Sequence, residues 1–407
     1  MITENPMTKQ ERRTVASLAL LYCFRMLGLF MVLPLLALYA ADLPGATPTL
    51  IGLAMGMYGL TQALLQIPLG WLSDQVGRKP IIITGLLLFA LGSIIAATSH
   101  SIGGIILGRT LQGAGAIAST VMAMVADLTR EEQRTKAMAV VGMSIGLSFA
   151  VALVLGPVVA SFGGLPAVFW FTAILAGGGV AIVTLLVPTP PVAGGEDTPW
   201  RQRLGLIWHS MGDRVLMRLN FSVFVLHFIL TASFMVVPGL LEQSFGVDRD
   251  HHWMVYLPVL LLSLAGMVPL MILAERRGRL RQMFLLGIAL VFVAVATLDF
   301  TSSRILFYGA LWLFFVGFNY LEATLPSLLS KTVSASSKGT AMGVYSTSQF
   351  LGAFAGGAGG GWLLQHLGEP VLTAVCLVLA ALWWLVVLRA PRLGEVSNVS
   401  PRPVPGV

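Results

Sequence analysis

Twelve apolar runs, each long enough to cross a lipid bilayer, constrain this chain more than any other feature. An α-helix needs about 20 predominantly apolar residues to span the hydrocarbon core. Hydrophobic residues make up 56% of the 407 residues and charged residues only 11%, whereas charged residues make up roughly a quarter of a soluble domain. We therefore expect an all-α membrane protein with twelve transmembrane helices at Val15–Ala40, Leu50–Leu72, Pro80–Thr98, Ile102–Ala126, Ala137–Ala160, Pro166–Val187, Leu216–Leu241, Trp253–Ala274, Met283–Phe300, Ile305–Leu329, Thr340–Leu364 and Val371–Leu388.

Lysine and arginine lie mostly on one side of this map of spans. Of the 25 basic residues, 21 fall in the termini, the central connection or loops on the same side. Arg249 and Arg304 fall on the other side, and Arg25 and Arg109 fall inside spans. Because cytoplasmic loops of multi-pass proteins carry the excess of Lys and Arg, we expect both termini in the cytoplasm. The net charge of +7 then reflects topology, and no nucleic-acid partner is expected.

Two pairs of segments repeat at a nearly constant offset. DQVGR (74–78) matches ERRGR (275–279) after 201 residues, and RTKAM (134–138) matches KGTAM (338–342) after 204 residues. Parallel repeats of this kind occur in one large class of transporters. The sequence therefore predicts two pseudo-symmetric six-helix halves, a cytoplasmic linker in which Trp200–Met211 has the spacing of a short interfacial helix, and a cytoplasmic tail. The expected ranges are 1–187 and 216–390 for the halves, 188–215 for the linker and 391–407 for the tail.

Several motifs resemble those of the major facilitator superfamily. GWLSDQVGRKP (70–80) resembles the superfamily's signature loop between helices 2 and 3, and RTLQGAG (109–115) is similar to its fourth-helix motif. The runs RMLGLFMVLP, YGLTQALLQIPLG, ADLTREEQRTKAM and KGTAMGVYSTSQFLG resemble the YajR-type drug-efflux-like subgroup. The resemblance covers nearly the whole chain and implies the superfamily's fold and secondary transport in the bacterial inner membrane. A soluble domain after the twelfth helix is expected to be absent, because only residues 391–407 follow the second half.

A conformational latch is expected at the signature loop. Asp74 and Arg78 share a turn at the end of the second span, and Asp127 ends the fourth, so an Asp–Arg–Asp network is expected on the cytoplasmic face. Gly70 and Gly77 belong to the same signature. Such a network is expected to hold the outward-open state, because rocking one half against the other would break it. The alternative is a solvated surface cluster that contributes little energy.

Two ionisable residues lie deep inside spans. Arg25 is about 15 Å from the cytoplasmic edge, so its guanidinium should face a cavity or a carboxylate. Glu322 lies about 10 Å deep in the tenth span, with Asn319 three positions before it on nearly the same face. Glu322 is a candidate proton carrier, and Arg25 facing it across the central opening is a candidate partner. The alternative for both residues is a static structural pair.

A second charged candidate lies at the other end of the fourth span. The superfamily resemblance associates Arg109, close to Gln112, with coupling, and Asp42 at the end of the first span is its expected partner. An arginine at that depth could also reach lipid head groups, and Asp42 could be a solvated helix end. The expected coupling set comprises Arg25, Glu322, Asn319, Arg109, Gln112 and Asp42.

A polar stripe runs along the second span at four-residue spacing. Its side chains could line a substrate route, although hydrogen bonding between helices explains the spacing equally well. Weaker candidates for lining the route lie in the seventh and eleventh spans. The full set is Tyr58, Gln62, Gln66, His227, Ser346 and Gln349.

These observations favour proton-coupled export of small, lipophilic compounds by alternating access, with the protein as a monomer. The fifth-helix antiporter motif is present only in part, with Gly156-Pro157 but Ala152 where a glycine is expected. A proton-coupled nutrient symporter or a facilitator is the alternative. No P-loop GxxxxGK[ST], HExxH or CxxC motif occurs, so no ATP hydrolysis, no metal site and no cofactor are expected. A receptor or membrane enzyme that reuses the fold is disfavoured.

Overall fold

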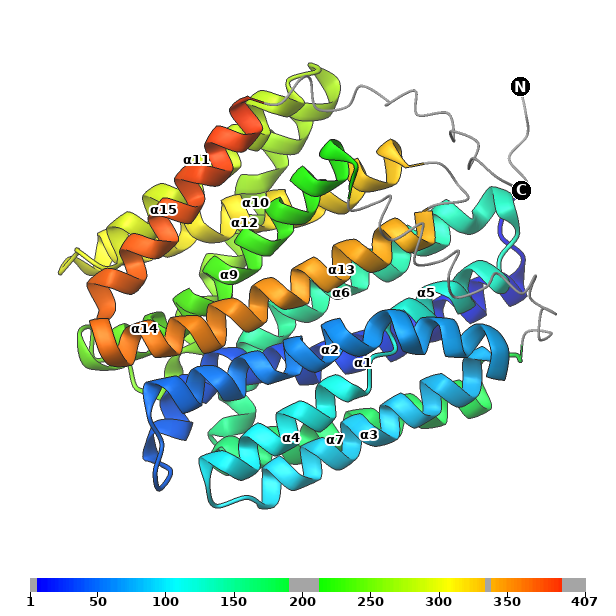
Figure 1. The fold of residues 1–407 in the computed structure, drawn as a ribbon, viewed down its shortest axis with the longest axis horizontal. Helices are drawn as coiled ribbons and strands as arrows, with labels where there is room; N and C mark the ends of the chain where they lie inside the picture. The colour runs from blue at the N-terminus through cyan, green and yellow to red at the C-terminus, as the bar shows by residue number, and fades with distance from the viewer. Residues whose placement is uncertain (1–5, 190–211, 334–337, 390–407) are drawn as a thin grey trace.

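The computed structural model describes residues 6–189, 212–333 and 338–389, which form helices joined by short loops (Figure 1). The first half contains α1 (Lys9–Tyr39), η1 (Ala40–Asp42), α2 (Pro48–Val76), α3 (Arg78–Thr98), α4 (Ile102–Ala114), α5 (Ala118–Asp127), α6 (Glu131–Ala160) and α7 (Gly164–Leu185). The second half contains α9 (Arg214–Gln243), η2 (Arg249–His251), α10 (Trp253–Arg276), α11 (Leu280–Leu298), α12 (Arg304–Thr332), α13 (Lys338–Phe354), η3 (Ala355–Gly359), α14 (Gly360–Leu367) and α15 (Glu369–Leu388). The expected linker and tail lie largely outside these residues.

The bundle has two chemically different ends. We call the end where α1 begins and α15 ends the basic end, because the starts of α3 and α6 there carry Arg78, Lys79, Arg130 and Arg134. We call the opposite end, which holds the loop 40–47, η2 and the start of α12, the far end. Figure 1 shows α13 of the second half running alongside α2 of the first half, whereas α11 and α15 are steeply inclined to them.

Ten helices in the described residues are long and apolar enough to cross a membrane, and the other two expected spans are interrupted. The fourth span is divided into α4 and α5, because the helix stops at Gly115 and resumes after Ile117. A break frees backbone carbonyls that need new donors inside a bilayer. Nη2 of Arg25 donates to the freed carbonyl of Gly115 over 3.1 Å, so one expected functional side chain stabilises this break.

The eleventh span contains a turn of π-helix, η3, between α13 and α14. The sequence there, AGGAG, carries little side-chain bulk. An added Cβ at Gly357 would lie 2.7 Å from the carbonyl oxygen of Gly52 on α2, and one at Gly356 would press on the carbonyl of Phe228 on α9. The π-turn therefore packs between α2 of the first half and α9 of its own half, with close backbone contacts on both sides.

Glycine is required where α2 meets this segment, and we expect Gly52→Ala to destabilise the protein. Its new Cβ would lie 2.8 Å from the Cα of Gly361 and even closer to the carbonyl of Gly357. Overpacking of this kind costs about 1–3 kcal/mol. The matched control is Gly309→Ala in the second turn of α12, where an added Cβ meets nothing within 4 Å. Thermal unfolding in detergent micelles should show a lower midpoint for Gly52→Ala only, and equal midpoints would contradict this packing.

Candidate functional site

Glu322, His227 and Gln349 meet in the second half, and we call them the Glu322 cluster. They come from α12, α9 and α13. Nε2 of Gln349 lies 3.2 Å from Oε1 of Glu322 and 2.8 Å from Nε2 of His227. Nε2 of His227 lies 3.7 Å from Oε2 of Glu322. The Glu322 side chain keeps 29% of its surface exposed, so a carboxylate and an imidazole lie together with partial access to the surroundings.

Phenylalanines cover this cluster on the side of the far end. Phe318 contacts the His227 ring at a centroid distance of 5.9 Å and the Phe149 ring at 5.6 Å. Phe149 of α6 also contacts Phe30 of α1 at 5.0 Å. Phe318 precedes Glu322 by one helical turn, about 6 Å nearer the far end. Because Phe30 and Phe149 belong to the first half, this aromatic packing joins the two halves beyond the carboxylate.

Arg25 lies inside the first half and is only 1% exposed. Besides Gly115, its Nη2 donates to Oε1 of Gln62 over 2.6 Å, and Nε2 of Gln62 donates to Oε1 of Gln66 over 2.8 Å. The Arg25 guanidinium lies 5.9 Å from the centre of the Tyr58 ring. The polar stripe of α2 is therefore buried and supplies hydrogen bonds from helix to helix in this structure.

Arg109 is also buried and lies close to the same aromatic ring. Its guanidinium lies 4.9 Å from the centre of the Tyr58 ring. Nη1 of Arg109 donates to Oε1 of Gln112 over 2.8 Å, and Nε2 of Gln112 donates to Ser93 of α3 over 2.8 Å. The first half thus encloses two arginines whose described partners are amide oxygens, backbone carbonyls and rings.

Two expected charge pairs are wrong. Arg25 donates to Gln62 and Gly115 within its own half, whereas Glu322 contacts His227 and Gln349 of the other half. Asp42 pairs with Arg249 at 2.9 Å, whereas Arg109 is bonded to Gln112. Both errors have the same cause, since depth along a helix is readable from the sequence and the direction in which a side chain points is not.

Asn319 and Ser346 have no described hydrogen bond to the Glu322 cluster. Nδ2 of Asn319 donates to Oγ of Ser263 on α10 over 3.0 Å, so its described bond leads away from Glu322. Ser346 is half-buried on α13, one turn before Gln349. His227 and Gln349, which the sequence favours least, are the described partners of the carboxylate.

The Asp–Arg–Asp network expected at the signature loop is present at the basic end. Nε of Arg78 pairs with Oδ2 of Asp127 at 2.9 Å, and Nη1 contacts Asp74 and donates to Oγ of Ser73 over 2.7 Å. Gly77 adopts a φ of +99° that places Arg78 after the turn, a conformation that favours glycine. These residues join α2, α3 and α5 of one half. The network is complete while the far ends of the halves are in contact, so the outward-open arrangement is not required for its formation.

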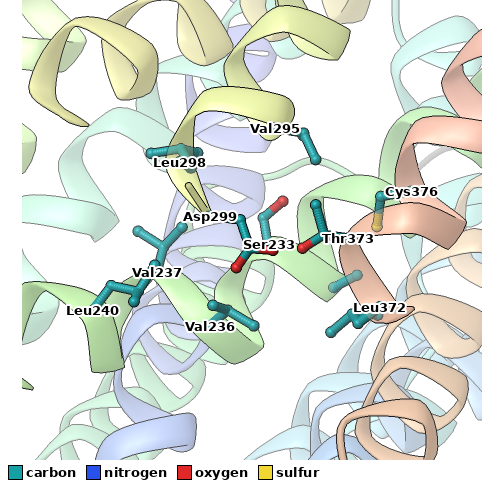
Figure 2. A pocket seen from close by; sticks show the side chains of 11 residues that line it. Ser233, Val236, Val237, Leu240, Val295, Leu298, Asp299, Leu372, Thr373 and Cys376 are labelled. Atoms are coloured by element: carbon teal, nitrogen blue, oxygen red, sulfur yellow. The ribbon is translucent and has the colours of Figure 1, made fainter. Parts of the chain in front are cut away.

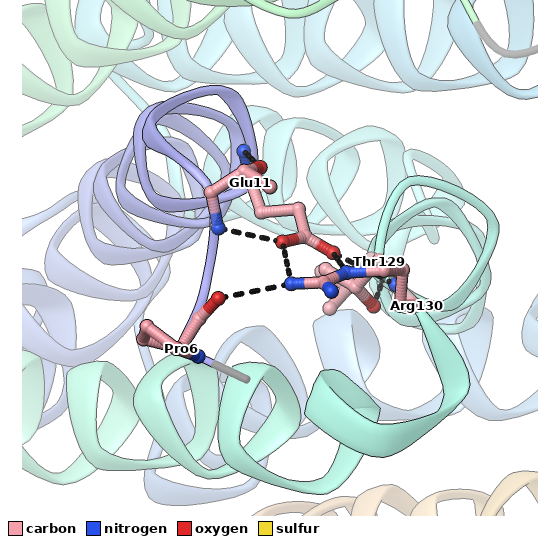
Figure 3. Close-up of polar contacts among 6 residues, drawn as sticks. Pro6, Glu11, Thr129 and Arg130 are labelled. Carbon is pink, nitrogen blue, oxygen red and sulfur yellow. Dashed lines mark hydrogen bonds and ion pairs between the residues drawn. The ribbon is translucent and has the colours of Figure 1, made fainter. Parts of the chain in front are cut away.

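A second ion pair at the basic end was not identified from the sequence. Figure 3 shows Glu11 of α1 accepting two bonds from the Arg130 guanidinium, each of 3.0 Å, and one from its backbone N–H. Glu11 also completes the capping box of α1 with Thr8, and this box was the readable signal. The pKa of Arg130 is raised because its guanidinium donates to the Glu11 carboxylate. The pair ties the start of α1 to the start of α6.

Charged groups also join the two halves at the far end, and we call this the Arg249 clamp. Arg249 of η2 pairs with Asp42 of the first half at 2.9 Å and with Glu242 at 2.9 Å. Its guanidinium lies 5.1 Å from the centre of the Tyr39 ring, and the Tyr39 hydroxyl donates to Oδ1 of Asp250 over 2.8 Å. The far ends of the halves are therefore held together by charge as well as by glycine packing.

A mostly apolar pocket opens between α9, α11 and α15 near the far end, as Figure 2 shows. Asp299, Ser233 and Thr373 are the main polar side chains in a lining otherwise made of residues such as Leu298 and Leu372. This pocket does not include any member of the Glu322 cluster. Arg25 and Arg109 of the first half do not line it either.

No group of three or more His, Cys, Asp or Glu side chains that could hold a metal ion occurs in the part of the chain that the structure describes. At the far end, Asp250 accepts from Tyr39 and His252 contacts the Val247 carbonyl.

A five-residue segment of α6, GMSIG (142–146), matches the sequence pattern of a nucleophile elbow. Ser144 in this segment donates to the backbone carbonyl of Val141. That motif needs a turn between strand and helix, so these five residues do not form a nucleophile elbow.

The profile of the Major Facilitator Superfamily matches residues 18–357 and 219–405. The chain belongs to the major facilitator superfamily. Among relatives, the inner membrane transport protein YajR of Escherichia coli (strain K12) is 47% identical over 97% of this chain and 86% of its own length. The multidrug resistance protein MdtH of Aeromonas salmonicida (strain A449) is 26% identical, covering 91% of this chain and 94% of its own.

Solved structures agree with this superfamily's fold. The D-xylose–proton symporter superposes with a TM-score of 0.75 at 16% identity, over 95% of this chain and 98% of its own. The chain is thus a superfamily member with twelve spans in two six-helix halves. The repeated signature also has a shared geometry, since Gly77 and Gly278 both have positive φ, at +99° and +63°.

In this superfamily member, we expect removal of the Arg249 clamp to separate the far ends. Arg249→Gln removes both ion pairs, each worth about 0.2–1 kcal/mol because the groups are partly exposed. Arg304→Gln is the matched control, since Arg304 donates to the Phe245 carbonyl within its own half. Spin labels at Phe162 and Phe300, which are 84% and 74% exposed at the far end, report the distance. Only the Asp42 pair crosses between the halves, so a roughly 1.4- to fivefold larger population of long distances is expected for Arg249→Gln only. An unchanged distribution would refute the clamp.

Proposed function

We propose that this chain is a secondary transporter of the bacterial inner membrane that exports small, lipophilic compounds in exchange for protons. The observation that carries the proposal is the Glu322 cluster, which places a carboxylate and an imidazole in the middle of a lipid-embedded chain. Ionisable groups at that depth are expensive to bury and mark substrate or proton pathways. The names of YajR and MdtH, a transport protein and a multidrug resistance protein, support export of drug-like compounds.

Alternating access supplies the mechanism. The Arg249 clamp and the aromatic packing of Phe149 on Phe318 lie between the Glu322 cluster and the far end. We propose that the structure represents the state closed at the far end, in which protons reach Glu322 from the basic end. Rocking of the halves would break the clamp and expose the same groups to the far side. A proton bound on one side is then released on the other.

The proposal places the basic end in the cytoplasm and the far end in the periplasm. Its support is the asymmetry of lysine and arginine, which is 21 residues against two. The Arg78 network then lies on the cytoplasmic face, where it stiffens one half as that half rocks. Glu11 and Arg130 have the same effect on α1 and α6. A monomer suffices for this cycle, because both halves belong to one chain.

The direction of transport is the finer part of the proposal. The D-xylose–proton symporter shares the fold, so the fold alone is compatible with import. Lipophilic dyes such as ethidium and acriflavine, offered to everted membrane vesicles at two external pH values, distinguish the cases. Dye accumulation driven by an acid interior supports antiport, and accumulation driven by a proton gradient of the opposite sign supports the symporter alternative.

The orientation makes a first prediction. Single cysteines at Phe162 and Phe300, in a chain without Cys23 and Cys376, should react with an impermeant maleimide in intact cells. Cysteines at Gln75 and Glu132, both exposed at the basic end, should react only after the membrane is opened. The reverse pattern would overturn the proposed topology.

Replacement of the carboxylate makes the second prediction. Glu322→Gln keeps the shape of the side chain and one oxygen that can accept from Gln349, but it cannot release a proton. In proteoliposomes we expect loss of pH-driven transport of the compound found in the dye screen, with exchange of that compound across the membrane retained. Asn319→Leu is the matched control on the same helix, because its described bond leads to Ser263. Wild-type pH-driven transport by Glu322→Gln would refute the proposed function.

A further inference from the structure

The hydrogen bonds around His227 fix which ring nitrogen carries the proton. Nδ1 lies 3.1 Å from the carbonyl oxygen of Val223, and a carbonyl only accepts, so Nδ1 carries the hydrogen. Nε2 faces the amide nitrogen of Gln349 at 2.8 Å, and an amide nitrogen only donates. His227 is therefore neutral in this arrangement, and the lone pair of Nε2 is occupied by Gln349.

A proton on His227 would have to enter at that same lone pair. Nδ1 is already protonated, so Nε2 is the only remaining basic position on the ring. Once Nε2–H forms, it faces a second donor at Gln349, and the nearest described acceptor is Oε2 of Glu322 at 3.7 Å. Oε2 of Glu322 is buried and has no hydrogen-bond partner among the described residues, so an acceptor stands ready for the new donor.

We propose that the proton and the Gln349 amide compete for Nε2 of His227, so that protonation detaches α13 from α9 and pairs His227 with Glu322. This inference rests on the proposed function, because it names the atom at which the coupled proton acts. His227 and Glu322 together hold the proton. Gln349 is a positioning residue, because its bond to His227 joins α13 to α9 only while the proton is absent from Nε2.

Release of Gln349 would affect the first half through α13, which packs on α2. Phe350 follows Gln349, and its ring contacts the ring of Tyr58 on α2 at a centroid distance of 6.1 Å. An added Cβ at Gly59 of α2 would lie 2.6 Å from the Phe350 carbonyl. Release of Gln349 therefore frees the segment of α13 that packs directly on the first half. A proton at His227 would in this way loosen the seam between the halves.

The other titratable groups near the cluster are few in the described ranges. Tyr345 of α13 interacts with Glu322, and Arg25 of α1, the helix of the first half that packs on α9, is bonded to Gln62 and Gly115. The remaining contact of the imidazole is the Phe318 ring of α12. Glu322 is thus the described carboxylate that faces His227.

The test uses the full-length protein in lipid nanodiscs, with ¹⁵N-labelled histidine and no substrate. The His227 resonances are those absent from His227→Gln or, should that variant not fold, those displaced in Gln349→Leu. At high pH the wild type should show the Nδ1–H form, and the Nε2–H form would overturn the proposal. In Gln349→Leu the competitor for Nε2 is gone, so at a given pH a larger share of His227 should carry a proton on Nε2 than in the wild type. Ser348→Ala, whose hydroxyl bonds to Val344, should leave it unchanged.

The distance between spin labels at Phe162 and Phe300 measures whether protonation separates the far ends of the two halves. The wild-type distance distribution should change with pH, and Gln349→Leu and His227→Gln should lose that change while Ser348→Ala keeps it. Suppose that Glu322→Gln loses pH-driven transport, but that Gln349→Leu and His227→Gln keep the wild-type change of the distance distribution with pH. The competition at Nε2 is then refuted, and the proposed function stands. If pH-driven transport survives in Glu322→Gln, the proposed function fails as well.

Discussion

The cost of placing charge in hydrocarbon shapes every part of this protein. An unpaired charge at the centre of a bilayer costs at least about 2.5–3.5 kcal/mol, and the two halves meet that cost in different ways. The first half seals Arg25 and Arg109 around the Tyr58 ring and satisfies them with amide and carbonyl oxygens. The second half leaves Glu322 partly exposed beside His227. A sealed permanent charge favours rigidity, whereas an accessible titratable group suits a proton that must come and go.

Contacts between the halves are concentrated away from the basic end. Glycine packing at Gly52, aromatic packing at Phe149 and the ion pairs of Arg249 lie from the middle of the bundle to the far end. Ion pairs of partly exposed groups are weak, so charge can hold the far end without locking it. Glycine contacts allow two backbones to slide with little steric change. The ion pairs and the glycine contacts together form an interface between the halves that is closed in this structure and can open again.

The sequence was sufficient for the fold and for much of the basic end. Apolar length set the number of spans. The Asp-x-x-Gly-Arg pattern at 74–78, repeated with glutamate at 275–279, located the Arg78 network, because the partners of Arg78 are neighbours in sequence or end adjacent spans. The breaks at Gly115 and Ala355–Gly359 were not foreseen, since glycine inside an apolar run is equally compatible with an unbroken helix. The Arg249 clamp and the Glu322 cluster join residues that are 207 and 122 positions apart. Such pairings depend on helix rotation, which hydropathy does not specify.

The central claim is that Glu322 takes up and releases a proton within the membrane. Infrared difference spectroscopy of the protein in liposomes measures this directly, because a protonated carboxyl group absorbs separately from a carboxylate. The account predicts a carboxyl band that appears on acidification of the side bearing the basic end and is missing from Glu322→Gln. Identical difference spectra for the wild type and Glu322→Gln would contradict it.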